Sequence, residues 1–520
     1  MEKNQRRNVI KPTLKFLDHD LVQQIISEAR DILCSLGIKI YHKQMRSILS
    51  HHGALIEENQ QNVRFTNDII DKALKTVPSS FRLYDVSGKQ THDFTGRQVY
   101  FTPASSALNI LEIDAGNGTN QIRQPNTGDY VRYVKVVDQL THIASQSTAF
   151  IPADVSEKIS DSYRLYLGLQ YGEKPIVTGT FSDDGFPIMK ELQVAVRGSE
   201  KELKEKPLTI FSCCPTTPLK WDERSCHDII RCGRSGIPVE LISMPLAGFT
   251  SPVTLVGSLV GHTAENLSGI VISQLSTPGA PLLYGGAAAA FDMRYGTTPL
   301  GAVESQMMAC AYNEIGKYLG IPTQAYIALS DAKALDTQAG AETAMGATMA
   351  ALSGINSISG PGMLDFINCF SIEKLVVDNE ICGMTYRILN GIEPKEDFPT
   401  LPLYQELLKE QHLLTSPHTR RYFKEEHYFP GKVIDRRSRA KWEEQGSPTL
   451  IEQAHTEVTR LINSYRLSSL PQDIKNQLTK IMESEARRCG MDRLPPAARP
   501  GGTLFEKTVP PGPPSKNFLL

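Results

Sequence analysis

Several common signals are missing from this chain of 520 residues, and each absence excludes a class of protein. No apolar run approaches the roughly 18 residues that a membrane-spanning helix needs. The opening MEKNQRRNVIKPTLKF has no apolar core of an export signal. Fifty-five basic against fifty-seven acidic residues give a net charge of −2, which does not favour a nucleic acid as partner. The sequence thus predicts a cytoplasmic protein without membrane attachment.

The nine cysteines form neither a CxxC pair nor a disulfide-framework spacing, which is typical of a reducing compartment. The adjacent Cys213 and Cys214 have no companion ligands nearby, so we expect no bound metal. No GxSxG or HExxH segment occurs, and the usual hydrolase signals are therefore missing. No GxGxxG or P-loop follows the first expected strand, which disfavours the alternative of an open, doubly wound sheet.

What is present is a long alternation of strand-like and helical segments. It runs over about 250 residues, the usual size of a TIM barrel. We therefore predict an α/β protein with a TIM (β/α)8 barrel at 131–394. The eight expected strands are 143–146, 175–181, 208–214, 239–244, 281–285, 323–329, 356–359 and 368–370.

Segments of different composition flank the predicted barrel. Residues 1–95 have the pattern of a small α+β region, and the β-rich, turn-rich residues 96–130 are expected to connect it to the barrel. Residues 395–492 carry mixed charge at helical spacing, which predicts a helical region. Residues 493–520 are rich in Pro and Gly, so we expect a flexible tail there.

The most informative stretch is 321–363, which reads as strand, loop, helix and strand. Its loop carries Asp331 at the carboxyl end of the first strand. Gln338 and Glu342 then lie on the apolar face of the following helix, at its amino-terminal end. This spacing places the three side chains together at the end of a barrel where the βα loops build active sites.

Other residues leave alternatives open. Lys333 has the chemistry of a Schiff-base lysine, but its position beyond the strand favours an ion pair with Asp331 or Asp336. Asp331 can orient a substrate amine or cap the following helix. His262 is more typical of a hydrogen-bonded helix residue than of a site. Aromatic residues near strand ends can line a pocket for a cation, because a cation over an aromatic ring gains about 0.5 to 2 kcal/mol of binding free energy. Packing in the core explains most of these aromatic residues equally well.

Several motifs together resemble those of the trimethylamine methyltransferase family. In the predicted barrel they are LSDAKALDTQAGAE (329–342), SGPGMLDF (359–366) and FSIEKLVVDNEICGM (370–384). Outside it they are SLGI (35–38), HGA (52–54), VRFT (63–66) and the segment 439–454. The similarity covers about residues 12–495.

The resemblance implies an enzyme that moves a methyl group from a methylated amine to the cobalt of a cobalamin on a separate corrinoid protein. The chain itself is then expected to bind no cofactor, and to form a homo-oligomer. Trimethylamine enzymes of the family carry pyrrolysine near the stretch that here reads IALSD (327–331), at Leu329 or a neighbour, whereas every residue of this chain is one of the standard twenty. The missing pyrrolysine favours a quaternary amine, such as glycine betaine or a related betaine, over trimethylamine.

On this interpretation, Asp331, Gln338 and Glu342 form the catalytic side of the site. The expected substrate-binding residues are Tyr100, Phe101, Tyr284, Tyr326, Leu329, Phe366, Arg294 and His262. Of these, Arg294 and His262 are candidates for holding a carboxylate tail. Two other functions stay open, namely a non-catalytic quaternary-amine sensor on the same scaffold and a Schiff-base lyase that uses Lys333.

Overall fold

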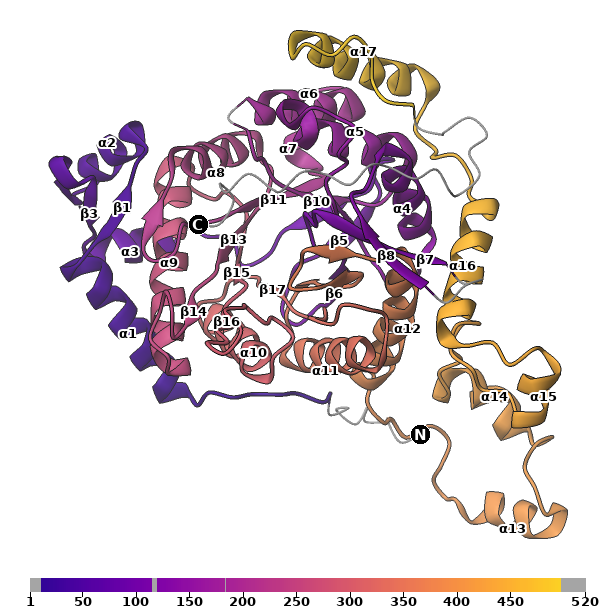
Figure 1. The fold of residues 1–520 in the computed structure, drawn as a ribbon. Helices are drawn as coiled ribbons and strands as arrows, with labels where there is room; N and C mark the ends of the chain where they lie inside the picture. Colours follow the sequence, from indigo (N-terminus) through magenta and orange to yellow (C-terminus); the bar gives the residue numbers. More distant parts are fainter. Residues whose placement is uncertain (1–10, 115–118, 183, 497–520) are drawn as a thin grey trace.

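Eight short parallel strands form the centre of the protein in a computed structural model, which describes residues 11–114, 119–182 and 184–496 (Figure 1). One sheet pairs β15, β13, β11, β10 and β9 in that order, and a second pairs β17, β18 and β6. Contacts join the two sheets on both sides, since Tyr284 bridges to Thr323 and the Ala144 amide donates to the Phe101 carbonyl at 2.8 Å. The strands therefore form a closed ring. They are β6 (Tyr100–Thr102), β9 (Gln146–Ser147), β10 (Ile176–Thr178), β11 (Thr209–Cys213), β13 (Val239–Ser243), β15 (Leu282–Gly286), β17 (Gln324–Tyr326) and β18 (Ser357–Ser359).

Helices surround this ring (Figure 1), and polar caps fix where many of them begin. The Asp222 carboxylate accepts the Ser225 amide at the start of α8, and Asp336 accepts the Ala339 amide at the start of α11. Gly236 ends α8 in the left-handed region that favours glycine. The helices are α4 (Thr127–Gln139), α5 (Ser160–Tyr171), α6 (Gly185–Arg197), α7 (Glu200–Glu205), α8 (Glu223–Ser235), α9 (Leu255–Ser276), α10 (Val303–Tyr318), α11 (Thr337–Ser353) and α12 (Ile372–Leu389), with the 3-10 turn η2 (Glu157–Ile159).

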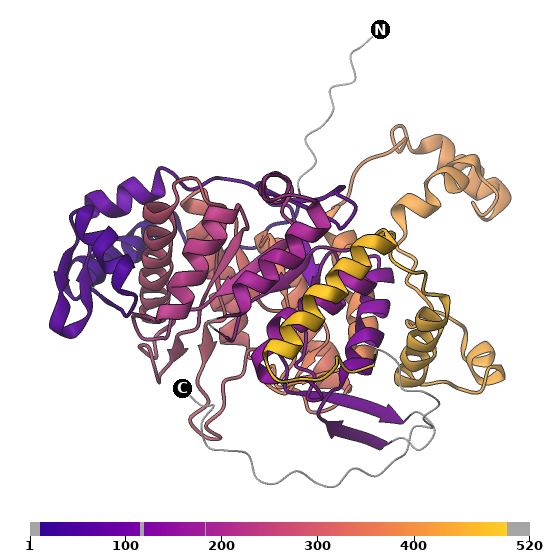
Figure 2. The same ribbon diagram turned by 90° about the horizontal axis from the view of Figure 1, so that it is seen from above.

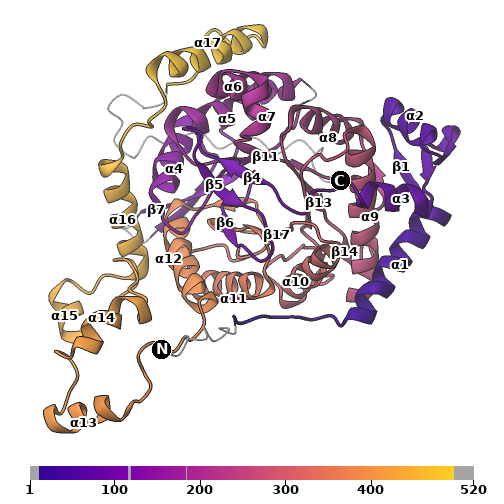
Figure 3. The same ribbon diagram turned by 180° about the vertical axis from the view of Figure 1, so that it is seen from behind.

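A hairpin of β4 (Arg82–Tyr84) and β5 (Gln90–Asp93) covers the middle of the ring in the view from behind (Figure 3). Leu83 and Phe94 of this hairpin region form one apolar cluster with Val177, Ile210 and Leu283. These last three residues lie on β10, β11 and β15, so they mark the inward side of each strand. Side chains two residues further along the same strand also point inward.

One expected strand of the ring is wrong. Cys369–Phe370 (β20) pairs with β7 and β19 in a separate four-stranded sheet, and β6 takes the place between β18 and β9. The ring thus begins at Tyr100, inside the segment 96–130 that we expected to be a connection. A three-residue strand among turns carries too little periodicity to be recognised, and its partner β18 lies some 250 residues away in sequence.

The remaining small sheets extend from the ring or cover it. They are formed by β7 (Asn109–Asp114), β8 (Thr119–Arg123), β12 (Lys220–Trp221), β14 (Leu246–Ala247), β16 (Ala289–Ala290), β19 (Met363–Leu364) and β20. The amino-terminal α+β region packs on α9 through α1 and α3. It consists of α1 (His19–Ser35), β1 (Ile38–Ile40), α2 (Lys43–His51), β2 (Leu55–Glu57), the 3-10 turn η1 (Glu58–Gln60), β3 (Asn62–Arg64) and α3 (Asn67–Leu74).

The carboxyl-terminal helices lie along the outside of the ring and beyond it. In the arm of α13 to α15, the chain extends away from the body (Figure 2), and α16 and α17 then pack on α12 and α6 respectively. They are α13 (Leu401–Glu410), α14 (Pro417–Glu426), α15 (Arg439–Glu444), α16 (Leu450–Ser464) and α17 (Gln472–Arg488). Within the described ranges, none of the helices combines the length and apolarity needed to cross a membrane. The expected Pro/Gly-rich tail falls outside the described residues from 497 onward.

Candidate active site

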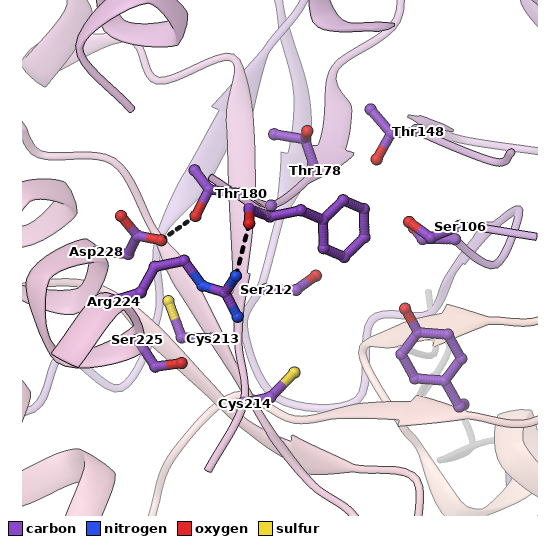
Figure 4. A pocket seen from close by; sticks show the side chains of 14 residues that line it. Ser106, Thr148, Thr178, Thr180, Ser212, Cys213, Cys214, Arg224, Ser225 and Asp228 are labelled. Atoms are coloured by element: carbon purple, nitrogen blue, oxygen red, sulfur yellow. Dashed lines mark hydrogen bonds between the residues drawn. The ribbon is translucent and has the colours of Figure 1, made fainter. Parts of the chain in front are cut away.

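A cavity of about 180 Å³ opens at the carboxyl ends of β6, β9, β10, β11 and β17 (Figure 4). The loops of a parallel ring converge at this end, where enzymes of this architecture build their sites. We call it the mouth cavity. Its wall combines hydroxyl groups with two aromatic rings and two charged side chains. The hydroxyl groups include those of Ser105, Ser106, Thr148, Thr178, Ser212 and Ser225.

A buried carboxylate lies behind the cavity wall, inside the ring. Ser212 points inward because it lies two residues beyond Ile210, and in the strand pairing it stands beside Glu240 of β13. The Ser212 hydroxyl donates to Glu240 Oε1 at 2.6 Å, while Oε2 has no hydrogen-bond partner among the described residues. Glu240 is fully buried, and this burial raises its pKa to about 7 although the Ser212 bond lowers it.

Tyr326 and Phe181 supply the two aromatic rings of the cavity. Ser357 of β18 pairs with Gln324 of β17 on one side and with Tyr100 of β6 on the other. Since the Tyr100 ring packs on the inner apolar cluster, Gln324 also points inward. Tyr326 lies two residues further along β17 and so points inward, toward the carboxyl end. Burial raises the pKa of its hydroxyl, and Glu240 is the next cause. The phenol therefore stays protonated and lies within the field of the Glu240 carboxyl.

A buried ion pair on α5 holds two parts of the cavity wall. Arg164 and Asp161 are 3.1 Å apart, and both are almost completely buried. Arg164 donates to the Ser106 hydroxyl at 3.1 Å and lies over the Phe181 ring. Asp161 accepts the amides of Phe181 and Ser182, at 2.5 and 3.0 Å. The ion pair thus connects the loops after β6 and β10 to α5. The side chains of these loops are therefore held in place before any ligand enters.

The other charged groups of the cavity come from α8. The Arg224 guanidinium extends from this helix into the cavity (Figure 4) and donates to the Phe181 carbonyl at 2.7 Å. Asp228 accepts the Thr180 hydroxyl, and burial raises its pKa to about 6 against the lowering effects of that bond, Arg231 and Arg224. Cys214 is exposed at the cavity, and the pKa of its thiol is raised, mainly by loss of solvation and next by Glu240. Its thiol is therefore not an ionised nucleophile near pH 7.

The three expected catalytic residues do lie together, in a cluster separate from the cavity wall. Glu342 accepts the Ser330 hydroxyl at 2.6 Å, the Asp331 amide at 2.8 Å and the Gln338 side chain at 2.8 Å. Asp331 accepts the Gly301 amide at 2.7 Å. Its burial raises its pKa to about 7, and Glu342 adds to the rise. These contacts fix the loop after β17, and none of the three residues lines the mouth cavity.

Lys333 lies outside the cavity as well. Its ammonium group donates to the Asp331 carbonyl at 2.6 Å, lies 3.5 Å from the Asp365 carboxylate and 3.7 Å from the centre of the Phe366 ring. The side chain is more than half exposed. The expected ion pair with Asp331 or Asp336 is thus wrong, because the partner is Asp365. An exposed, paired lysine is also a poor Schiff-base nucleophile, and Phe366, one of the expected pocket aromatics, covers this lysine instead.

Three of the expected aromatic residues lie away from the cavity, one because it is at the amino end of the ring and two because strand alternation turns them outward. Tyr100 lies at the amino end of the ring, where its ring is 4.4 Å from that of His92. Phe101 points outward against Tyr386 of α12, at 5.4 Å between ring centres. Tyr284 also points outward, and its hydroxyl donates to Thr263 of α9. These aromatic residues stabilise the layer between strands and helices or the closed end of the ring.

Three further expected residues have no place in the cavity wall. His262 is fully buried beside Tyr284, and burial lowers its pKa to about 3, so it stays neutral. Arg294 lies on the surface and pairs with Asp292 at 2.6 Å. Leu329 is buried and follows Ala328, which has a positive φ of 66°. Neither expected holder of a carboxylate tail therefore faces the cavity.

Several residues in or directly behind the cavity wall were not among the sequence predictions. Glu240 had a recognisable signal, because a carboxylate within the apolar strand Val-Glu-Leu-Ile-Ser (239–243) needs a partner or a ligand once buried. Arg224 and Asp228 had none, since their role depends on how α8 packs on the ring. In the described part of the chain, no three His, Cys, Asp or Glu side chains gather as a metal site requires.

A parallel α/β ring with a polar cavity at the carboxyl ends of its strands has the architecture of an enzyme. The family model of trimethylamine methyltransferase (MTTB) matches residues 2–490. Trimethylamine methyltransferase MttB of Methanosarcina thermophila is 29% identical over 473 residues, which cover 89% of this chain and 95% of the relative. Glycine betaine methyltransferase of Desulfitobacterium hafniense strain Y51 is 27% identical over 481 residues, which cover 92% of this chain and 98% of the relative.

Among solved structures, the monomethylamine methyltransferase of Methanosarcina barkeri aligns with a TM-score of 0.47 and 11% identity, over 88% of this chain and 89% of that chain. This likeness is too weak to decide the fold or the function. The family match, in contrast, spans nearly the whole chain. The chain therefore belongs to the trimethylamine methyltransferase (MTTB) family and is a methyltransferase, which confirms the resemblance found in its motifs.

Proposed function

We propose that the ring is a (β/α)8 barrel and that the enzyme transfers a methyl group from a quaternary amine to the Co(I) corrinoid of a separate protein. A betaine is the expected substrate. The observation that carries the proposal is the buried, incompletely bonded Glu240 carboxyl behind a cavity wall that includes the ring of Tyr326. Together they offer a negative charge and an aromatic surface to the same ligand.

Glu240 has an environment that a cationic ligand would complete. No Lys or Arg in the described chain forms an ion pair with it, and no cation contributes to the shift of its pKa. A buried carboxylate without a cation is costly, whereas a quaternary ammonium group brings a permanent positive charge. The ring of Tyr326 adds a cation–π attraction of about 0.5 to 2 kcal/mol.

The chemistry of a quaternary amine also fits the groups present. When the C–N bond breaks, its electron pair stays on nitrogen, and the amine leaves in the neutral form without needing a proton. The Co(I) centre on the separate protein supplies the nucleophile that takes the methyl carbon. The residues of this chain then have to hold the ammonium group in place, exclude water and orient one methyl group toward the opening. None of these tasks needs an ionised cysteine or a Schiff-base lysine.

The family includes proteins named for both trimethylamine and glycine betaine. Every residue of this chain is a standard amino acid, whereas the trimethylamine enzymes carry pyrrolysine. The absence of this residue supports the quaternary amine over trimethylamine. The exposed, paired position of Lys333 gives no support to the Schiff-base lyase.

A substrate panel tests the proposal. Glycine betaine, proline betaine, carnitine, γ-butyrobetaine, choline and trimethylamine are each incubated with the enzyme and Co(I) cobalamin, or with a corrinoid protein, and methylcobalamin is followed by absorbance. We expect turnover of a betaine, with trimethylamine inert. Turnover of trimethylamine alone would contradict the proposal. Tight binding of a betaine without methyl transfer to either acceptor would favour the sensor.

A further inference from the structure

The mouth cavity is electrically polarised, which matters for a substrate with two charged ends. Glu240 lies behind the wall at Ser212, and Arg224 enters from α8. Cys214 lies within the field of both, because Glu240 raises the pKa of its thiol and Arg224 lowers it, in addition to the larger effect of burial. A carboxyl group behind the wall and a guanidinium in the wall therefore both act on the same small cavity.

The Arg224 guanidinium has hydrogen-bond donors that are not used within the described chain. It makes one hydrogen bond in the described chain, to the Phe181 carbonyl at 2.7 Å, although a guanidinium carries five N–H donors. Its nearest carboxylate, Asp222, lies 3.7 Å away and accepts the Ser225 amide as the helix cap. The side chain is about one-third exposed. A ligand can therefore reach the guanidinium without first breaking a close ion pair.

The other acidic group in this part of the wall is already engaged. Asp228 accepts the Thr180 hydroxyl, and both Arg231 and Arg224 lower its pKa. The Thr178 hydroxyl is a further possible donor, since it lines the cavity, is buried and has no partner among the described residues. Arginine binds carboxylates through strong, often paired hydrogen bonds, and the Thr178 hydroxyl can add one more donor.

We propose that Arg224 binds the anionic end of the substrate, and that it thereby sets the selectivity of the enzyme for quaternary amines with a carboxylate over those with a neutral tail. Arg224 takes the role that we first assigned to Arg294 and His262. The inference rests on the proposed function in one respect, namely that the ligand is a quaternary amine. Arg224 is a specificity residue that contacts the part of the substrate away from the reacting methyl group.

Calorimetry on the full chain without any corrinoid tests this role directly. The probes are glycine betaine and choline, which share the trimethylammonium group and differ in whether the short tail ends in a carboxylate or a hydroxyl. We expect the unmodified enzyme to bind glycine betaine at least tenfold more tightly than choline. The substitution Arg224→Met removes the charge at similar length and should bring this ratio close to one, with choline affinity changed less than about threefold.

Arg224→Lys is the matched control, because it keeps the charge and loses the fork of donors, so it should retain part of the preference. If Arg224 only supported the Phe181 loop, Arg224→Met would lower the affinity for glycine betaine and for choline equally. That result would overturn the inference. Equal affinity of the unmodified enzyme for the two probes, or binding of neither, would also overturn it. The binding ratio is read without methyl transfer, so a failure of the proposed reaction is recognised separately in the substrate panel.

Discussion

At the scale of single residues, Glu240 carries the most specific prediction. Its pKa of about 7 means that the carboxyl is largely protonated below neutral pH and ionised above it. A cationic substrate binds the ionised form, so kcat/KM should rise with pH up to about 7 and then level off, changing about tenfold per unit well below that value. Glu240→Gln should lower kcat/KM at pH 8 at least tenfold and abolish this rise.

The matched control for Glu240 is Asp331, whose pKa is also raised to about 7. Asp331 is hydrogen-bonded to Gly301, whereas Glu240 is hydrogen-bonded to Ser212 of the cavity wall. In Asp331→Asn, kcat/KM should still rise with pH up to about 7. The opposite result would be loss of the pH dependence of kcat/KM in Asp331→Asn and its persistence in Glu240→Gln. It would show that the substrate cation binds near Asp331, in the cluster first expected from the sequence, and not near Glu240.

Asp331 should instead affect stability. Its pKa is near 4 in an unfolded chain and about 7 in the folded protein, so between these values the folded state holds a proton that the unfolded chain has released. The free energy of unfolding therefore falls as pH rises through this window. In Asp331→Asn the fall should be smaller by more than about 1 kcal/mol, as measured by urea unfolding at pH 5 and pH 8. An unchanged pH dependence would show that the carboxyl is not protonated there.

Residue by residue, the sequence predicted only part of the site. The spacing of Gln338 and Glu342 correctly placed them beside Asp331, because a helix face is a local property. The aromatic candidates were less successful, since whether a residue at a strand end points inward depends on the register between strands. Tyr326 points into the cavity and Tyr284 points away from it, although both were chosen for the same reason.

At the scale of elements, α5 is the helix on which the cavity wall depends. Removing one partner of its buried pair leaves an uncompensated charge, which typically costs about 3 to 5 kcal/mol. Asp161→Asn should therefore destabilise the protein by that order, as measured by urea unfolding. It should also lower methyl transfer, because the Phe181 and Ser106 segments lose their common support.

An exposed pair provides the control for this prediction. Lys201 and Glu205 lie 3.9 Å apart on α7, with most of the lysine side chain in solvent, and such pairs contribute little. Lys201→Ala should change neither stability nor turnover measurably. Equal effects of the two substitutions would contradict the view that the ion pair of α5 holds the site.

The elements also show which features could not be predicted from the sequence. The helix at Thr337–Ser353 and the strands of the five-stranded sheet were predicted near their observed positions, because a helical face and apolar runs between helical segments are local signals. The short strand β6 was assigned to a connection and β20 to the ring. Both are two or three residues long, and only their pairing across the chain decides which of them joins the ring.

At the scale of the whole molecule, the closed ring brings the site together from distant parts of the chain. Ser106, Thr178, Ser212 and Tyr326 meet at one cavity because their strands belong to the same closed ring and end on the same side. The hairpin of β4 and β5 fills the opposite end with apolar side chains. We therefore expect the ligand to enter, and the methyl group to be transferred, at the mouth cavity.

The most direct test of the central claim is to follow labelled methyl groups from substrate to cobalt. Glycine betaine with deuterated N-methyl groups is incubated with the enzyme and Co(I) cobalamin or a corrinoid protein, and the products are analysed by mass spectrometry. We expect dimethylglycine with two deuterated methyl groups and trideuteromethyl cobalamin in equal amounts. Recovery of unchanged betaine from a protein that binds it tightly, with either acceptor present, would contradict methyl transfer from a quaternary amine.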